Sequence, residues 1–196
     1  MDANNSDRLY NEIQAVLLGE LANRESVLIR ADTPTILREL GLKNYPILFS
    51  QSHIRNCLHA KGQNPHWHGL TCEFLCALPE FLEKPVAVYD SLNVEDSVVC
   101  VLNAVDNEGL PIIASLRLGS QGQYHFEKLD SNYLTSVYGK NNLETALDRA
   151  QDCDFLLYAN KKRTLELGNL TKLQLLGGLP QSEFDKIIHQ TNNMSN

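Results

Sequence analysis

Histidines gather in one short window of the chain, Ser50–Leu70. The window holds His53, His59, His66 and His68, four of the 6 histidines in the sequence, and it contains no Asp or Glu. Histidine titrates near neutral pH, so such a cluster suits proton transfer, metal binding or contact with phosphate. We therefore take this window as the first candidate for a functional site.

His66 and His68 form the pair in this window that fits chemistry best. They stand two residues apart, so an extended segment points both side chains to one face. One interpretation is general acid–base catalysis, with His53 on the preceding helix as a further candidate. The other is structural: both histidines form local hydrogen bonds beside the next helix, and Trp67 fills a gap in the core.

The same window and the residues after it contain potential zinc ligands. However, no CxxC pair occurs, and Cys72 and Cys76 stand one helical turn apart beside apolar residues, as core cysteines do. We predict no metal and no cofactor, and a zinc-stabilised domain remains a second alternative. The potential ligands are Cys57, His59, His66, His68, Cys72 and Cys76.

Two other segments carry groups that suit a phosphate. Ser136, Tyr138 and Lys140 in the segment SVYGK offer hydroxyl and ammonium donors, although, taken alone, the segment is better explained as an ordinary strand followed by a turn. Lys161 and Lys162 belong to the strongest positive run, YANKKR, which a solvated surface usually explains. These lysines matter for catalysis only if the fold brings them beside the histidines.

Composition limits the class of protein. The chain has 196 residues, a hydrophobic fraction of 43% and a formal net charge of −7, as expected for one soluble globular domain. It shows neither a signal peptide nor an apolar run long enough for a membrane helix, so we expect no contact with a membrane. The 5 cysteines are odd in number, which indicates reduced thiols and a cytoplasmic location. The negative charge argues against non-specific binding to nucleic acid, so RNA binding requires a local positive patch.

The hydrophobic pattern predicts helices first and strands afterwards. We expect helices over 7–23, after Thr33-Pro34, over about 52–60 and over Cys72–Leu82, with a further helix from Leu143. We expect a turn at 106–109 and another at 130–132. The predicted strands are Ser26–Arg30, Tyr45–Ser50, Val86–Ser91, Ser97–Val105, Leu110–Leu118, Tyr124–Leu129, Leu134–Tyr138 and Phe155–Tyr158.

This order predicts an α+β fold in which N-terminal helices pack on a bent antiparallel β-sheet. We expect one domain over residues 1–196. Its parts are an N-terminal helical part at 1–44, a core at 45–163 and a C-terminal extension at 164–196, where Ser182 begins a last short helix.

Three segments together resemble a known family. They are HGLTCEFLCALPEFLEKPVAVYDS, then VVCVLNAVDNEGLPIIASLRL, and then SVYGK followed by LLYANKKR. They are similar to a domain of phage polyvalent proteins. This domain occurs at the C-terminus of MuF-type head-morphogenesis proteins and their bacterial toxin relatives, and also in large mobile-element proteins. Related phage modules are assigned to the barnase–EndoU–colicin–RelE (BECR) group of ribonuclease folds.

The resemblance implies a barnase- or RelE-like fold and a hydrolase or toxin that cleaves RNA without metal. On this chain it implies acid–base roles for His66, His68 or His53. Ser136, Tyr138 and Lys140 would hold the phosphate, and Lys161 and Lys162 would add charge. The alternative, which the acidic composition motivates, is an inactive module that binds a protein partner in immunity, anti-defence or phage assembly.

Overall fold

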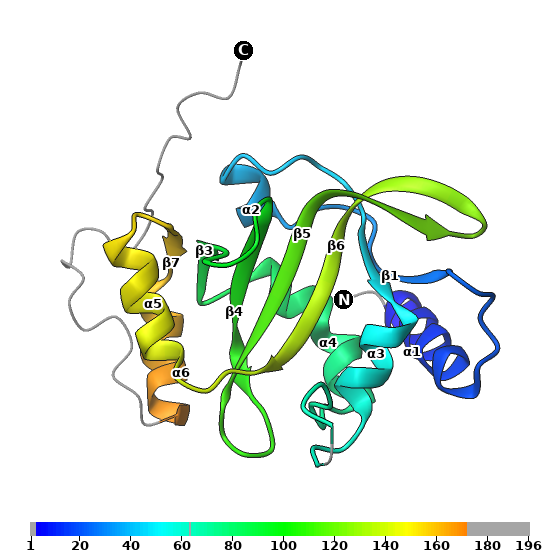
Figure 1. The fold of residues 1–196 in the computed structure, drawn as a ribbon, viewed down its shortest axis with the longest axis horizontal. Helices are drawn as coiled ribbons and strands as arrows, with labels where there is room; N and C mark the ends of the chain where they lie inside the picture. Colours follow the sequence, from blue (N-terminus) through cyan, green and yellow to red (C-terminus); the bar gives the residue numbers. More distant parts are fainter. Residues whose placement is uncertain (1–2, 63, 172–196) are drawn as a thin grey trace.

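A seven-stranded β-sheet forms the centre of the protein (Figure 1). The structure is a computed structural model that describes residues 3–62 and 64–171. The strand order is β1-β2-β6-β5-β4-β3-β7. In chain order, the described elements are α1 (Ala3–Leu18), β1 (Ser26–Arg30), α2 (Thr35–Glu39), β2 (Ile47–Ser50), α3 (Gln51–Leu58), α4 (Cys72–Glu83), β3 (Ala87–Asp90), β4 (Ser97–Val105), β5 (Pro111–Tyr124), β6 (Glu127–Gly139), α5 (Leu143–Asp152), β7 (Leu156–Ala159) and α6 (Lys161–Thr171).

The sheet is mixed, whereas the sequence predicts an antiparallel one. β2 and β6 run parallel, with Ile47 opposite Asn132 and Phe49 opposite Leu134. The prediction is wrong for this pair because β2 and β6 are separated in the chain by two helices and three strands. Only a short hairpin forces neighbouring strands to run in opposite directions. The α+β class itself is confirmed.

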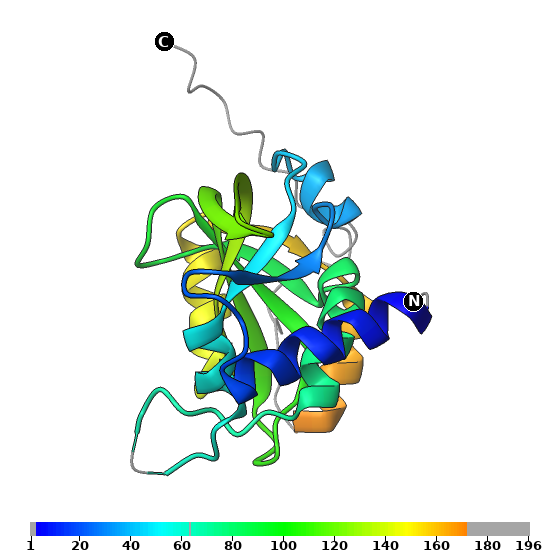
Figure 2. The ribbon, with the colours of Figure 1, turned by 90° about the vertical axis from the view of Figure 1, so that its right-hand side faces the viewer.

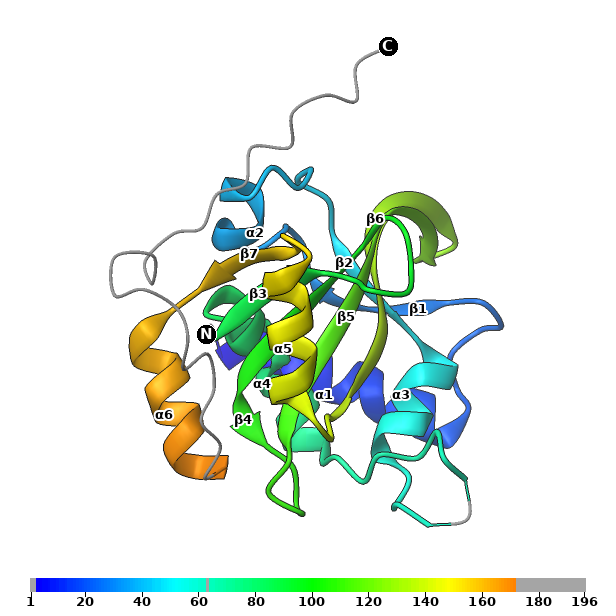
Figure 3. The same ribbon diagram turned by 60° about the vertical axis from the view of Figure 1, so that its left-hand side comes forward.

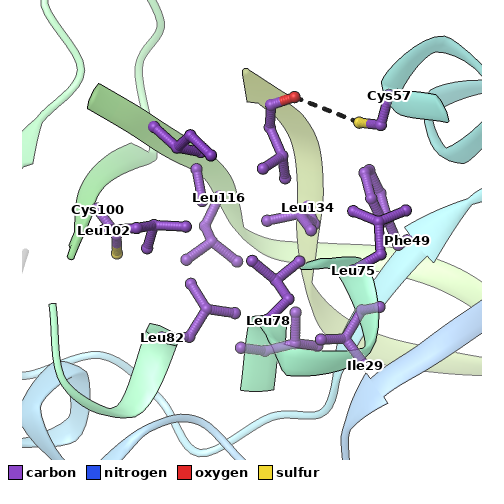
Figure 4. Packing of buried hydrophobic residues seen from close by; sticks show 14 of the residues in the cluster. Ile29, Phe49, Cys57, Leu75, Leu78, Leu82, Cys100, Leu102, Leu116 and Leu134 are labelled. Carbon is purple, nitrogen blue, oxygen red and sulfur yellow. Dashed lines mark hydrogen bonds between the residues drawn. The ribbon is translucent and has the colours of Figure 1, made fainter. Parts of the chain in front are cut away.

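Two groups of apolar side chains cover the two faces of the sheet. α1, α3 and α4 contribute to the larger core, where Leu75 and Leu78 of α4 pack with Leu116 and Leu134 of the sheet (Figures 2 and 4). α5 and α6 contribute to a second core over β3, β4 and β7 (Figure 3). Burying both faces explains why the central strands have long apolar runs rather than strict alternation.

Several predicted bounds differ from those of the structure, and two of the differences have a clear physical cause. α1 ends at Leu18 instead of residue 23, because Gly19 adopts φ +73° and closes the helix with a bond from Glu20 N to Ala15 O of 2.9 Å. The predicted turn at 130–132 lies inside β6, and the chain reverses at His125 and Phe126 instead. Both of these residues have positive φ, as a two-residue hairpin turn requires.

Contacts with another part of the chain hold this unusual turn. The Glu25 carboxylate accepts hydrogen bonds from Phe126 N at 2.9 Å and from Gln123 Nε2 at 2.8 Å. Histidine adopts a left-handed conformation more often than most residues, but a bulky residue such as Phe126 rarely does, so the local sequence gives little signal for the turn. The predicted helix after Ser182 lies outside the described residues.

The burial of the cysteines gives a test of this packing. Burial raises the pKa of Cys57 and Cys100 to about 12, whereas Cys153 is exposed. Thiolates, not thiols, react with alkylating reagents. We expect iodoacetamide at mildly alkaline pH to modify Cys153 in the folded protein, and Cys57 and Cys100 only after denaturation, as mass spectrometry of peptides would show. Labelling of Cys100 as fast as that of Cys153 would contradict the fold.

Candidate functional site

The candidate site is built against a tight turn between β4 and β5. The carboxylate of Asp106 accepts hydrogen bonds from Glu108 N and Leu110 N, both at 2.9 Å. Its side chain is only 2% exposed and pairs with Lys61 Nζ at 2.8 Å. Gly139 at the end of β6 makes room for this arrangement, because a Cβ there would collide with the Asp106 carboxylate. The turn therefore sits directly against the end of SVYGK.

The segment between α3 and α4 is attached to the same place. His68 N donates to Asn56 O at 2.9 Å and Gly69 N donates to His59 O at 2.7 Å, which folds the segment back on α3. Asn107 Nδ2 donates to Gly69 O at 3.2 Å. In Figures 1 and 2 this segment and the β4–β5 turn lie together at the lower end of the sheet. Backbone contacts therefore fix where the His66–His68 segment lies.

Asn64 shapes the part of the segment that carries the histidines. Its Oδ1 accepts from His66 N at 2.9 Å, and its carbonyl accepts from Trp67 N at 3.1 Å. The Trp67 ring lies 4.8 Å from the His59 ring, centre to centre. His66 is left exposed, whereas Trp67 and His68 are half-buried.

These parts enclose a hollow of about 650 Å³, which we call the histidine cleft. The segment carrying the histidines forms one wall, and the end of β6 with the residues after it forms the other. At the junction, the His68 and Tyr138 rings stack, with centres 5.2 Å apart and an angle of 27° between their planes. The lining residues are Lys61, Gly62, Asn64, Pro65, His66, Trp67, His68, Glu108, Leu110, Ser136, Tyr138, Gly139, Lys140 and Asn141.

The surroundings set the charge state of the stacked pair. Burial lowers the pKa of His68, and the nearby positive charges of Lys61 and His66 lower it further. Burial raises the pKa of Tyr138. At neutral pH, His68 is therefore a neutral imidazole that can accept a proton, and Tyr138 is a phenol that can donate a hydrogen bond.

The structure brings together five of the eight residues predicted for the site: His66, His68, Ser136, Tyr138 and Lys140. Their catalytic and binding roles remain predictions. Asn64, Trp67 and Asn141 line the cleft as well, although no motif singled them out as functional residues. The local sequence does indicate a turn in this wall, because Pro65 directly follows Asn64.

The other three predicted residues lie elsewhere. His53 sits on α3 with its ring 6.3 Å from that of Phe49, and burial lowers its pKa. Lys161 and Lys162 begin α6, and Lys162 borders a separate hollow with Lys84 and Glu166. The positive run is therefore not beside the histidines, because β7 and α6 lie at the far edge of the sheet from β6.

The alternative of a zinc site has no geometric support among the described residues. In residues 3–62 and 64–171, no group of three or more His, Cys, Asp or Glu side chains is placed to hold a metal ion. The Cys57 thiol instead donates to Val137 O at 3.3 Å in the core (Figure 4). Within the same ranges, none of the helices is both long and apolar enough to cross a membrane.

Comparison with known families bears on the part of the chain that forms this cleft. The sequence model of the phage MuF C-terminal domain matches residues 59–166, more than half of the chain. The chain belongs to this family. Neither the curated proteins nor the solved structures that were searched gave a match.

The MuF C-terminal domain match contains every residue that lines the histidine cleft. It begins at His59 and therefore leaves out α1, β1, α2, β2 and α3, including His53. The family region thus carries both walls of the cleft. The N-terminal elements support the family region by extending its sheet and covering one face.

The ion pair between Lys61 and Asp106 predicts that the free energy of unfolding of this MuF C-terminal domain depends on pH. Burial alone raises the pKa of Asp106, but the Lys61 ammonium and the two turn N–H groups outweigh it and hold the pKa below its ordinary 3.8. As pH falls, the unfolded chain is protonated first, so the stabilisation is present above about pH 4 and disappears at lower pH.

We expect Asp106→Asn to lower the free energy of unfolding by about 1–2 kcal/mol at neutral pH, because it removes a charged hydrogen bond. Lys61→Met should cost a similar amount, and the two changes together should cost less than their sum. Urea unfolding at several pH values measures this. Glu108→Gln is the control, since Glu108 is 58% exposed and should change stability by less than about 0.5 kcal/mol. Additive effects, or a cost that does not shrink at all as the pH falls below about 4, would contradict this role for Asp106.

Proposed function

We propose that this domain is a ribonuclease that cleaves RNA in the histidine cleft without a metal ion. The observation that carries the proposal is the stacked pair of His68 and Tyr138, placed beside His66 and Lys140 in one open cleft. A neutral imidazole, a phenol and an ammonium group are the kinds of group that phosphodiester transfer requires. A relation to the barnase–EndoU–colicin–RelE folds is part of this proposal.

The proposed chemistry assigns one task to each group. The neutral His68 takes the proton from the ribose 2′-hydroxyl, and the 2′-oxygen then attacks the adjacent phosphorus. His66, at the exposed mouth of the cleft, gives a proton to the departing 5′-oxygen as the P–O5′ bond breaks. The Tyr138 hydroxyl and the Lys140 ammonium stabilise the extra negative charge on the phosphate oxygens. The products are a 2′,3′-cyclic phosphate and a free 5′-hydroxyl.

The charges at the histidine cleft suit contact with a few phosphates of an RNA rather than with a long stretch of its backbone. Lys61 and Lys140 line the cleft, but Asp106 and Glu108 pair with Lys61. Among the described residues, Lys140 forms no ion pair, so its charge is available to a phosphate. With a net charge of −7, the chain has little general attraction for nucleic acid. Substrate selection then rests on the cleft itself.

The decisive experiment is cleavage of short labelled RNAs in EDTA. We expect the wild type to cut RNA and to leave unchanged an RNA with 2′-deoxyribose at the scissile position. His68→Gln should slow cleavage at least about 100-fold, and His66→Gln or Lys140→Met at least about tenfold, as expected for loss of acid–base or charge stabilisation. The pH profile should fall on the acid side below the ordinary histidine value, because the pKa of His68 is lowered.

Matched variants outside the cleft serve as controls. His53→Gln and Lys162→Met replace the same residue types away from the cleft and should leave the rate within about twofold of the wild type. A requirement for Mg²⁺, cleavage of the deoxy substrate, or equal rates for His68→Gln and His53→Gln would overturn the proposal.

A second candidate function is recognition of a protein partner without catalysis, which the net charge of −7 favours. This function predicts no RNA cleavage in any variant. It also predicts a bound partner that dissociates as the salt concentration rises.

A further inference from the structure

A second hollow lies at the other end of the sheet. It has a volume of about 390 Å³, within the usual range for small-molecule sites. It is bounded by the segment between α2 and β2, the end of β3, the start of β4, the middle of β5 and of β6, and β7. In Figures 1 and 3, α2 and these strand ends lie at the top, opposite the β4–β5 turn. It shares no residue with the histidine cleft.

Apolar side chains form the inside of this hollow, which we call the leucine pocket. Val98 and Leu157 are buried members of the main core, and Leu118, Leu40 and Leu42 pack against that core while remaining partly exposed. The pocket is therefore a place where the core opens to solvent. An apolar ligand group placed here gains the free energy of leaving water.

Carboxylates stand among these apolar groups. Asp90, at the end of β3, is half-buried, and its carboxylate has no hydrogen bond or ion pair with another described residue. Burial raises the pKa of Asp90, as expected where water is only partly available to the charge. Asp96 lines the pocket directly before β4, and its carbonyl accepts a hydrogen bond from Leu118 N of β5 at 2.8 Å. The rim also carries the exposed Lys43, which forms no ion pair among the described residues.

A charged group that is half-buried without a partner is costly, and a ligand of opposite charge removes that cost. An anion is disfavoured, because the two carboxylates outweigh the one ammonium group at the rim. A neutral apolar compound would leave Asp90 less hydrated and still unpaired. The chemistry that satisfies both the interior and the rim is an apolar body with a positive charge at one end.

We infer that the leucine pocket binds a small organic ammonium compound, whose apolar part packs on Val98, Leu118 and Leu157 and whose ammonium group pairs with Asp90. This site is independent of the proposed ribonuclease activity. The leucine pocket is thus a ligand-binding site at the end of the sheet opposite the histidine cleft.

The test compares three compounds of similar size on the full chain: 2-phenylethylamine, the neutral 2-phenylethanol and the anion 3-phenylpropionate. Titration is followed by the amide NMR signals of the protein. We expect the amine to bind with a dissociation constant of roughly a millimolar or below, as its small size allows. The signals of Leu118, Gly119 and Leu157 should shift, and those of His68 and Tyr138 should not. The alcohol should bind about tenfold more weakly and the anion more weakly still.

Two single substitutions at the rim should have opposite effects. Asp90→Asn should weaken amine binding about tenfold and remove its advantage over the alcohol, because the amide cannot pair with a cation. Lys43→Met should leave amine binding equal or tighter, because it removes a like charge. Thermal unfolding of Asp90→Asn checks that the fold is intact, and its Tm should not fall. Equal binding of amine and alcohol to the wild type, no binding of the amine, or shifts confined to the histidine cleft would overturn the inference.

Discussion

The buried carboxylate of Asp106 is the contact on which the histidine cleft depends. It closes the β4–β5 turn through two backbone N–H groups, fits against Gly139 where β6 ends, and holds Lys61 of the segment that carries the histidines. A buried carboxylate is tolerated only when its oxygens are fully used, and here three donors satisfy it. The three segments that meet at Asp106 are far apart in the sequence, so this one group fixes both walls of the cleft relative to each other.

That arrangement also explains why His68 differs from the other histidines of the window. The backbone bond from His68 N to Asn56 O directs the residue toward the sheet, and Tyr138 covers one face of its ring. The ring loses part of its hydration while Lys61 lies close by, and both effects disfavour a second proton. His66, two residues earlier, stays in solvent. Two histidines with such different surroundings suit different tasks in proton transfer.

The sequence predicted local features better than long-range ones. β1 and β4 have their predicted bounds, because each is a run of β-branched residues ended by turn or polar residues. The parallel pairing of β2 with β6 and the turn at His125 and Phe126 were missed, since both depend on residues distant in the chain. For the site, no spacing rule connects HWHG with SVYGK, so only the family resemblance suggested that they meet. Charge alone suggested Lys161 and Lys162, and charge carries no information about which end of the sheet a helix occupies.

The N-terminal elements help to form the leucine pocket but do not line the histidine cleft, although both hollows lie on the same sheet. Thr33 is fully buried, and its hydroxyl oxygen receives Asn132 Nδ2 at 2.9 Å and Tyr45 N at 3.0 Å, which ties the segment before β2 to β6. Thr33 and Tyr45 lie outside the region that matches the MuF C-terminal family, whereas Asn132 lies inside it. The connection therefore anchors an N-terminal segment, residues 40–45, whose residues form one wall of the leucine pocket. The histidine cleft, in contrast, is made wholly of residues inside that region. Changes in the N-terminal segment can therefore alter the leucine pocket while leaving the lining of the histidine cleft intact, which makes the two places free to vary independently.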